Sequence, residues 1–339
     1  MSFRVLIADP SLSVRSVLRR YVETVPELSV AGEARDDRET LRLARDLRPD
    51  AIIADADLAR FDGPGSLEDI QSHRPAPVIL ISSGGDRERL IATFRSLGRG
   101  AVAVFAKPTV PREWEHLGEA LGETLRHLAG RSRRTPRPSH PPPAISDEFI
   151  RLVAVGASTG GPSALAEMLH HLGSRSSVPV VVVQHIAAGF EPALADWLAG
   201  ETGLDVGLAR DGEKLVGGAI RLAPARSHLT VENGVTARLD PRSPPVNGHQ
   251  PSADVLFTSL LGWQPARTAV VLLSGMGCDG VAAMAELRSR GALTIAQDEV
   301  SSAVWGMPGC AVERGAASLV LEPAAIGDYL RIHAGGRDA

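Results

Sequence analysis

Short apolar, β-rich runs alternate with helical patterns in two separate stretches of this 339-residue chain. In the first stretch the strand-like runs lie at 4–8, 28–31, 51–54, 78–82 and 102–106, with helical patterns at 14–24 and 40–47. In the second they lie at 152–155, 178–183, 269–273 and 293–296, with a turn-rich insertion over 220–239. Strands that alternate with helices form parallel sheets covered by helices. The sequence therefore predicts two doubly wound α/β domains, the second with a small β insertion.

The two stretches are separated by a segment that cannot form a core. Residues 127–143 read HLAGRSRRTPRPSHPPP and contain no aliphatic residue after Ala129. A proline- and arginine-rich composition of this kind predicts an extended, solvated linker. The predicted domains are therefore 1–125 and 148–339, joined by a linker over 126–147.

Charge and composition argue against several classes of protein. A formal charge of −4 gives no electrostatic reason to expect nucleic acid or an anionic membrane as a partner. The apolar run at the N-terminus turns acidic at Asp9, too early for a signal peptide or a spanning helix, so we expect a cytoplasmic protein with no membrane insertion. The two cysteines, Cys278 and Cys310, suggest neither a disulfide framework nor a zinc site.

A serine follows the first strand-like run of the second domain in a recognisable turn. Residues 156–162 read GASTGGP, which has the G-x-S-x-G spacing at a strand–turn–helix junction and exposes Ser158. Because ligands of open α/β sheets bind beyond the carboxyl ends of the strands, the ends of neighbouring strands matter most. There His185 follows the run at 178–183, and Asp279 follows the run at 269–273.

Serine, histidine and aspartate together suggest nucleophilic catalysis. A serine hydroxyl needs an imidazole to take its proton, and a carboxylate orients the imidazole and stabilises its charged form. Backbone N–H groups at the start of the following helix, near Thr159, would point at the oxyanion. The chain order Ser158, His185, Asp279 matches none of the three familiar triad orders, so a convergent geometry is expected rather than a standard α/β-hydrolase.

Each of these residues also has a simpler interpretation. A glycine-rich turn after a strand is often structural or binds a dinucleotide, but the sequence here lacks the middle glycine of G-x-G-x-x-G, and no carboxylate follows the second strand. Taken alone, His185 reads as a polar residue at a strand end and Asp279 as a helix N-cap. Only the three together predict a catalytic site.

Several blocks of the second domain resemble the chemotaxis protein-glutamate methylesterase family over 151–329. The blocks are 156–162, Gln184-His185, Ala223-Pro224 with His228-Leu229, 251–257, 274–280 and 296–308. The resemblance implies a Rossmann-like domain that hydrolyses glutamyl γ-methyl esters on methyl-accepting chemotaxis receptors and also deamidates receptor glutamines, with no cofactor for the hydrolase.

The family's site residues fall on particular positions of this chain. Its nucleophile, base and carboxylate correspond to Ser158, His185 and Asp279, and its oxyanion donors to Thr159 and the Met276 N–H. Cys278 lies beside the triad aspartate and is interpreted as a packing residue.

The family also carries an N-terminal response-regulator receiver, a flavodoxin-like domain, and the first domain resembles one. Asp55 matches the phosphoacceptor, Ser82 the conserved hydroxyl, and Lys107 the lysine after the fifth strand. An aspartate held with Mg²⁺ and a lysine suits an acyl phosphate, because the cations neutralise the developing charge. The resemblance implies a chemotaxis histidine kinase as phosphoryl donor, receptors as partners, and a monomer.

The receiver departs from the usual pattern at two places. Receivers usually show two adjacent acids after the first strand, whereas this chain has Asp9-Pro10. The predicted metal set is therefore Asp9, Asp55 and Asp57, with weakened Mg²⁺ binding unless Asp57 compensates. The usual aromatic switch position falls on Val104.

Two functions of other classes remain open at this point. The chain could be a non-catalytic scaffold that binds receptor tails and carries a degenerate, unphosphorylated receiver. It could also be a transcriptional regulator, but no helix-turn-helix pattern or basic patch follows the linker, and the linker's arginines read better as part of a tether.

Overall fold

The computed structural model describes residues 2–58, 76–131, 149–174 and 176–334. The chain forms two compact units, residues 1–135 and 136–339. None of the helices in these described ranges combines the length and the apolarity needed to cross a membrane.

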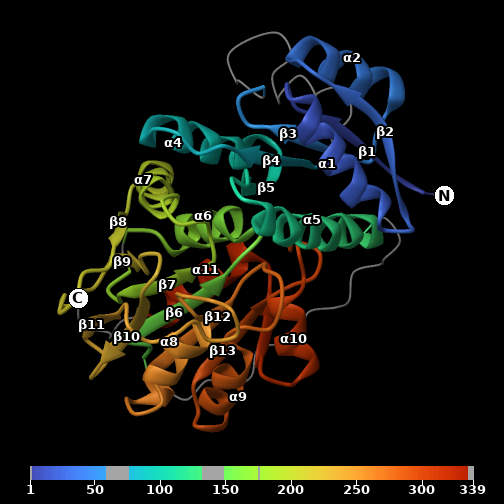
Figure 1. Ribbon diagram of the computed structural model, residues 1–339. Helices are drawn as coiled ribbons and strands as arrows, with labels where there is room; N and C mark the ends of the chain where they lie inside the picture. The colour runs from blue at the N-terminus through green and yellow to red at the C-terminus, as the bar shows by residue number, and fades with distance from the viewer. Residues whose placement is uncertain (1, 59–75, 132–148, 175, 335–339) are drawn as a thin grey trace. The chain divides into compact units, whose positions relative to one another are not determined.

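The first unit is built on a five-stranded parallel sheet (Figure 1). Its strands stand in the order β2-β1-β3-β4-β5, so the chain adds one strand beside β1 and then continues on the other side, as in doubly wound folds. The predicted runs coincide with these strands apart from shifts at their ends. The strands are β1 (Phe3–Ala8), β2 (Leu28–Ala34), β3 (Ala51–Asp55), β4 (Val78–Ser82) and β5 (Ala101–Ala106).

Capping side chains mark where the first helices begin. The Ser11 hydroxyl accepts a hydrogen bond from the Val14 N–H, and the Asp36 carboxylate accepts one from the Glu39 N–H. The described helices of this unit are α1 (Leu12–Glu23), α2 (Asp37–Leu47), α4 (Arg87–Arg95) and α5 (Pro111–Arg131), with a 3-10 turn η1 (Ser96–Arg99).

Helix α5 extends past the predicted domain boundary at 125. Leu121, Leu125 and Leu128 are all buried, and their spacing continues one apolar stripe along the helix against the sheet. The helix therefore continues to Arg131, inside the range predicted as linker. The remainder of that predicted linker, 132–147, lies outside the described residues.

The second unit contains a seven-stranded sheet in which every pair is parallel. Its order is β14-β13-β12-β6-β7-β9-β8. The four predicted runs correspond to β6, β7, β12 and β13. The strands are β6 (Leu152–Ala157), β7 (Val180–Gln184), β8 (Asp205–Leu208), β9 (Ala219–Leu222), β12 (Thr268–Leu272), β13 (Leu293–Gln297) and β14 (Leu319–Leu321).

Helices cover both faces of this sheet (Figure 1). One face shares its core with α8, α9 and α10, where Phe257 and Met284 are fully buried. Helices α6, α7 and α11 pack together on the other face. The helices are α6 (Gly161–Leu172), α7 (Glu191–Thr202), α8 (Ala253–Ser259), α9 (Val281–Ser289), α10 (Met307–Glu313) and α11 (Pro323–His333), with a 3-10 turn η2 (Pro265–Arg267).

The predicted insertion at 220–239 is partly a separate element and partly main sheet. Strands β10 (His228–Glu232) and β11 (Thr236–Asp240) form the small antiparallel pair that was expected. Strand β9, however, joins the seven-stranded sheet beside β7. Strands β8, β9 and β14 are only three or four residues long, which gives a periodic pattern too little length to register.

The two cysteines are bonded to each other, contrary to the expectation from the sequence. Cys278 and Cys310 form a disulfide with their Cα atoms 5.7 Å apart, so the view that they suggest no disulfide, and that Cys278 serves as a packing residue alone, is wrong in this structure. The reason is tertiary: the Gly306 and Met307 N–H groups both donate to the Gly275 carbonyl, which brings α10 against the loop that carries Cys278.

Candidate active site

The polar residues after β6 lie where the order of strands reverses. Strand β6 pairs with β7 on one side and with β12 on the other. The chain runs outward from β6 through β7 and later returns to add β12, so this is the topological switch point at which open α/β sheets bind ligands. Ser158 is the first residue after β6.

The turn that carries Ser158 is closely packed. Gly160 has φ +75°, and a Cβ there would lie 2.4 Å from the Ala303 Cβ and 2.7 Å from the Ser274 Oγ, so only glycine fits. The Ser158 N–H donates to the Ser274 carbonyl at 3.0 Å, and its carbonyl accepts from the Gly161 N–H at 2.9 Å. These contacts fix the backbone of the serine between β6 and α6.

Strand register places the serine beside the histidine. Ala157 pairs with Gln184, so Ser158 and His185 are the next residues on adjacent strands, and the His185 N–H donates to the Ala157 carbonyl at 2.8 Å. The buried Gln184 amide links them, because its Nε2 donates to the Ser158 carbonyl at 2.8 Å and to the His185 carbonyl at 3.0 Å. Sequence analysis gave no role to Gln184.

His185 and Asp279 form the predicted pair. Nε2 of His185 lies 2.9 Å from Oδ2 of Asp279, and the two side chains are 9% and 1% exposed. Nδ1 of His185 is buried and has no hydrogen-bond partner among the described residues. The aspartate thus holds Nε2, and Nδ1 is the nitrogen that remains to accept a proton.

Asp279 is held at the start of helix α8 by further donors. Its Oδ1 accepts from the Ser252 hydroxyl at 2.7 Å and from the Asp254 N–H at 3.1 Å, while the Ala253 N–H donates to Oδ2 at 2.6 Å. Burial alone would raise the pKa of Asp279, but the hydrogen bonds from His185, Ser252 and Ala253 and the charge of His185 lower that pKa to about 2. The carboxylate is therefore ionised at neutral pH.

The predicted oxyanion donors are available at the same place. Within the described residues the N–H groups of Thr159 and Met276 donate to no protein acceptor. The loop that carries Met276 lies against the serine, since a Cβ on Gly275 would be 2.8 Å from the Ser158 Cβ. The Ser274 hydroxyl donates to the Thr159 carbonyl at 2.7 Å and so joins the two donor segments.

A second histidine, for which no sequence pattern predicted a role, lies on the predicted base His185. The ring of His249 stacks on the ring of His185, with centroids 3.9 Å apart and an interplanar angle of 3°. The only sequence signal near it is the Asn247-Gly248 dipeptide, which is typical of a tight turn but reveals nothing about what the next residue contacts.

The first unit brings together three of its predicted residues at the ends of β1, β3 and β5. Lys107 Nζ lies 2.6 Å from Oδ2 of Asp9 and 2.6 Å from Oδ2 of Asp55, and both carboxylates are buried. Burial would lower the pKa of Lys107, but the hydrogen bonds that Lys107 donates to the two aspartates outweigh this and raise its pKa. Ser82 is buried at the end of β4, and its carbonyl accepts from the Lys107 N–H at 2.7 Å.

The predicted metal set is only partly assembled. Asp9 and Asp55 converge on Lys107, whereas Asp57 is exposed, and no group of three or more His, Cys, Asp or Glu side chains in the described ranges is placed to hold a metal ion. Two buried carboxylates are suitable ligands for a hard cation such as Mg²⁺, but Pro10 contributes no side-chain oxygen. The residues therefore fit Mg²⁺ with one carboxylate fewer than usual, and the three-residue metal set remains a prediction.

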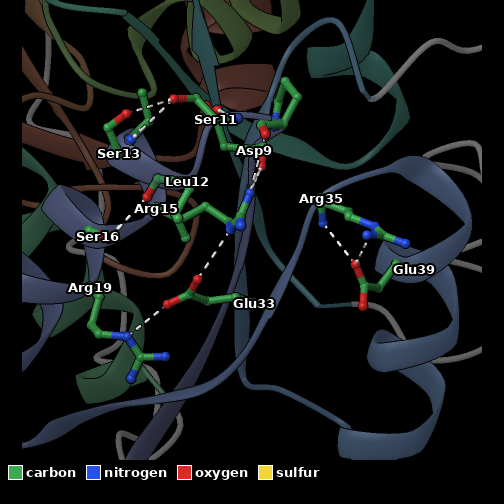
Figure 2. A network of polar contacts seen from close by, with 12 residues as sticks. Asp9, Ser11, Leu12, Ser13, Arg15, Ser16, Arg19, Glu33, Arg35 and Glu39 are labelled. Carbon is green, nitrogen blue, oxygen red and sulfur yellow. Dashed lines mark hydrogen bonds and ion pairs between the residues drawn. The ribbon is translucent and has the colours of Figure 1, made fainter.

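An arginine on α1 fixes the loop beside this pocket. Arg15 Nη1 donates to the Asp9 carbonyl at 2.7 Å and to the Pro10 carbonyl at 3.3 Å, and its Nε lies 3.1 Å from Oε2 of Glu33 (Figure 2). Arg19 pairs with the other oxygen of Glu33 at 2.7 Å. The network holds the Asp9-Pro10 backbone on α1 and β2.

Comparison with known proteins finds a family match for each of the two units. The CheB methylesterase family model matches residues 153–330, and the response regulator receiver domain model matches residues 5–117. A protein-glutamate methylesterase/protein-glutamine glutaminase of Anaeromyxobacter dehalogenans is 38% identical over 97% of this chain and 98% of its own length. A protein of the same description from Myxococcus xanthus is 39% identical over 91% of this chain and 90% of its own.

A solved structure supports the same assignment for the second unit. The crystal structure of the Thermotoga maritima CheB methylesterase catalytic domain is 34% identical and has a TM-score of 0.52, covering 54% of this chain and 98% of that domain. The chain therefore belongs to the CheB methylesterase family and carries a response regulator receiver domain before its methylesterase domain.

Proposed function

We propose that this chain is a protein-glutamate methylesterase that removes methyl esters from glutamate side chains of methyl-accepting chemotaxis receptors. The observation that carries the proposal is the buried His185–Asp279 pair. His185 follows the strand next to that of Ser158, and its Nδ1 has no hydrogen-bond partner among the residues that the structure describes. The descriptions of the relatives, which name protein-glutamate methylesterase and protein-glutamine glutaminase, support protein glutamate side chains as the substrate class. The receptor substrate and a cytoplasmic location belong to the proposal and rest on the sequence resemblance.

The first half of the reaction uses Ser158 as nucleophile. Its Oγ attacks the carbonyl carbon of the glutamyl methyl ester while Nδ1 of His185 takes the hydroxyl proton. The carbonyl oxygen becomes an oxyanion, which the Thr159 and Met276 N–H groups stabilise. Each such donor is typically worth about 3–4 kcal/mol. The C–O bond to the methoxy group then breaks, and His185 returns the proton so that methanol leaves.

The second half regenerates the enzyme. Water attacks the glutamyl ester of Ser158, gives a proton to His185, and displaces the serine oxygen, which recovers that proton; the product is the free glutamate side chain. Asp279 remains a carboxylate throughout and stabilises the imidazolium that forms twice per cycle, as its lowered pKa requires.

The same intermediate supports deamidation of receptor glutamines. An amide substrate would lose ammonia in place of methanol, and His185 would protonate that leaving group by the same route. Both activities stand in the descriptions of the relatives, and both need only the acyl-serine formed at Ser158.

Regulation is proposed to act through Asp55. The buried Asp55 carboxylate lies on Lys107 beside Asp9, the arrangement that suits an aspartyl phosphate, with a histidine kinase as donor. Asp9 and Asp55 would hold Mg²⁺, which would neutralise charge on the transferred phosphoryl group.

The experiment that tests the enzymatic proposal measures methanol. Receptor-containing membranes labelled on their glutamyl methyl groups are incubated with the purified full chain, with and without acetyl phosphate and Mg²⁺. We expect release of labelled methanol in proportion to enzyme concentration, and a higher rate with acetyl phosphate. The absence of enzyme-dependent methanol under both conditions would contradict the proposal and favour the non-catalytic scaffold.

A further inference from the structure

His249 lies against the triad base although no hydrogen bond requires it there. The rings of His249 and His185 are parallel within 3° and their centroids are 3.9 Å apart. Among the described residues the ring nitrogens of His249 have no hydrogen-bond partner. The His249 ring is therefore in contact with His185 through face-to-face packing and not through a hydrogen bond.

A tight turn delivers the His249 ring to this position. The backbones of Val246 and His249 exchange two hydrogen bonds, at 3.0 and 2.9 Å, around Asn247 and Gly248, both of which have positive φ. This is the reciprocal pairing of a two-residue hairpin turn, which fixes the direction of its flanking residues.

The segment that carries His249 also binds the carboxylate of Asp279 through hydrogen bonds. Three and four residues beyond His249, the Ser252 hydroxyl and the Ala253 N–H donate to Asp279. The segment 246–254 therefore contacts His185 through a ring face and Asp279 through hydrogen bonds, so one short segment touches both partners of the 2.9 Å His185–Asp279 contact.

On the basis of the proposed esterase function, we propose that His249 is a positioning residue whose stacked ring fixes the plane of the His185 imidazole and so keeps Nε2 on Asp279. The contact between His185 and Asp279 depends on the orientation of the His185 ring. A rotation of the His185 ring about its side-chain torsion would separate Nε2 from Asp279. A parallel ring at 3.9 Å opposes that rotation.

The stack also suits the charge that His185 acquires during the reaction. A neutral ring repels an imidazolium less than a second charged ring would, so the charge state of His249 matters for the stack. Burial lowers the pKa of His249, the charge of His185 lowers it further, and Asp279 opposes the shift. His249 is therefore neutral at neutral pH and does not compete with its neighbour for the proton.

The test compares two substitutions of similar volume in the full chain. His249→Phe retains an aromatic face and removes the ring nitrogens, whereas His249→Leu fills the space without an aromatic face. We expect His249→Phe to keep kcat for methanol release within about threefold of the wild type. His249→Leu should lower kcat by about 10- to 100-fold with an unchanged KM, because small misplacements of a catalytic group have costs of this order. His170→Leu, at the far end of α6 from Ser158, is the matched control and should have no effect.

A second readout does not depend on the substrate. The ring protons of His185, assigned in an NMR spectrum with a His185→Gln variant, should carry an upfield shift from the stacked ring in the wild type and in His249→Phe, and should lose it in His249→Leu. If the wild type releases no methanol, the proposed function fails whatever these shifts are. If the wild type is active and the Leu and Phe variants have equal kcat, the positioning role is wrong. A Phe variant as slow as the Leu variant would also overturn it, because the ring nitrogens would then be what matters.

Discussion

The hydroxyl of Ser252 donates a hydrogen bond to Oδ1 of Asp279 at 2.7 Å, and both side chains are almost completely buried. Ser252 is at the same time the N-cap of α8, where its oxygen accepts from the Val255 N–H. One side chain thus ties the triad carboxylate to the first turn of a helix. The position of Asp279 depends on α8 as much as on its own loop.

Replacement of Ser252 by alanine should therefore destabilise the second unit and slow the enzyme. A hydrogen bond to a charged group and an N-cap each contribute on the order of 1–2 kcal/mol, so the free energy of unfolding should fall by roughly 1–3 kcal/mol. The matched control is Ser289→Ala. The exposed Ser289 hydroxyl donates only to the Glu286 carbonyl, so this substitution should change the free energy of unfolding by less than about 0.5 kcal/mol. Denaturant unfolding followed by tryptophan fluorescence measures both. Equal values for the two variants would show that the Ser252–Asp279 contact adds nothing.

The lowered pKa of Asp279 predicts a pH dependence of stability. Because its folded-state pKa, about 2, lies below the ordinary value of 3.8, ionised Asp279 stabilises the fold by about 2 kcal/mol. That contribution is fully present well above the unfolded-state pKa of 3.8 and is lost as the pH falls through about 2. The difference in unfolding free energy between the wild type and Asp279→Asn should therefore be constant from neutral pH down to about pH 5 and should narrow toward pH 2. A difference that stays constant down to pH 2 would contradict the linkage.

Gln184 should matter for turnover more than for substrate binding. Its Nε2 holds the Ser158 and His185 carbonyls at 2.8 and 3.0 Å, so Gln184→Leu leaves both carbonyls without that donor and loosens the relation of nucleophile to base. We expect kcat to fall by about 10-fold or more, with KM within about twofold. Initial-rate kinetics on methylated receptor separates the two constants, and a change confined to KM would place Gln184 in substrate binding.

In the receiver pocket a substitution should strengthen binding, whereas the substitutions above should weaken stability or activity. Pro10→Asp restores a carboxylate next to Asp9, so the affinity for Mg²⁺ should rise by roughly 10-fold, or about 1.4 kcal/mol. Calorimetric titration of the two forms with Mg²⁺ measures this, and Asp55→Asn should weaken binding in both. Equal affinity of the wild type and Pro10→Asp would mean that Asp57 or another oxygen already completes the site.

Most of the fold and the placement of the three proposed catalytic residues could be predicted because they depend on local patterns. Apolar runs in the sequence predicted β1, β6 and β12. Ser158, His185 and Asp279 each follow such a run, at the edge of the sheet where parallel strands end together. The G-x-S-x-G turn is itself a local constraint, as the close contacts around Gly160 show.

The remaining features depend on contacts between distant segments. The Cys278–Cys310 disulfide exists because α10 docks on the Gly275 carbonyl, and no spacing rule contains that contact. His249 stacks on His185 from 64 positions further along the chain, and its neighbours in sequence give no hint of it. The length of α5 depended on how far its leucine stripe remained buried.

The most direct test of the account is the loss of one oxygen atom from the nucleophile. Ser158→Ala should lower methanol release from methylated receptor by on the order of 10⁴-fold or more while the protein keeps its thermal unfolding transition. The control is Ser163→Ala, in the first turn of α6. It removes a buried hydroxyl that has no hydrogen-bond partner among the described residues, and it should release methanol at the wild-type rate. A folded Ser158→Ala protein that releases methanol within tenfold of the wild type would contradict the assignment of Ser158, His185 and Asp279 as the catalytic triad.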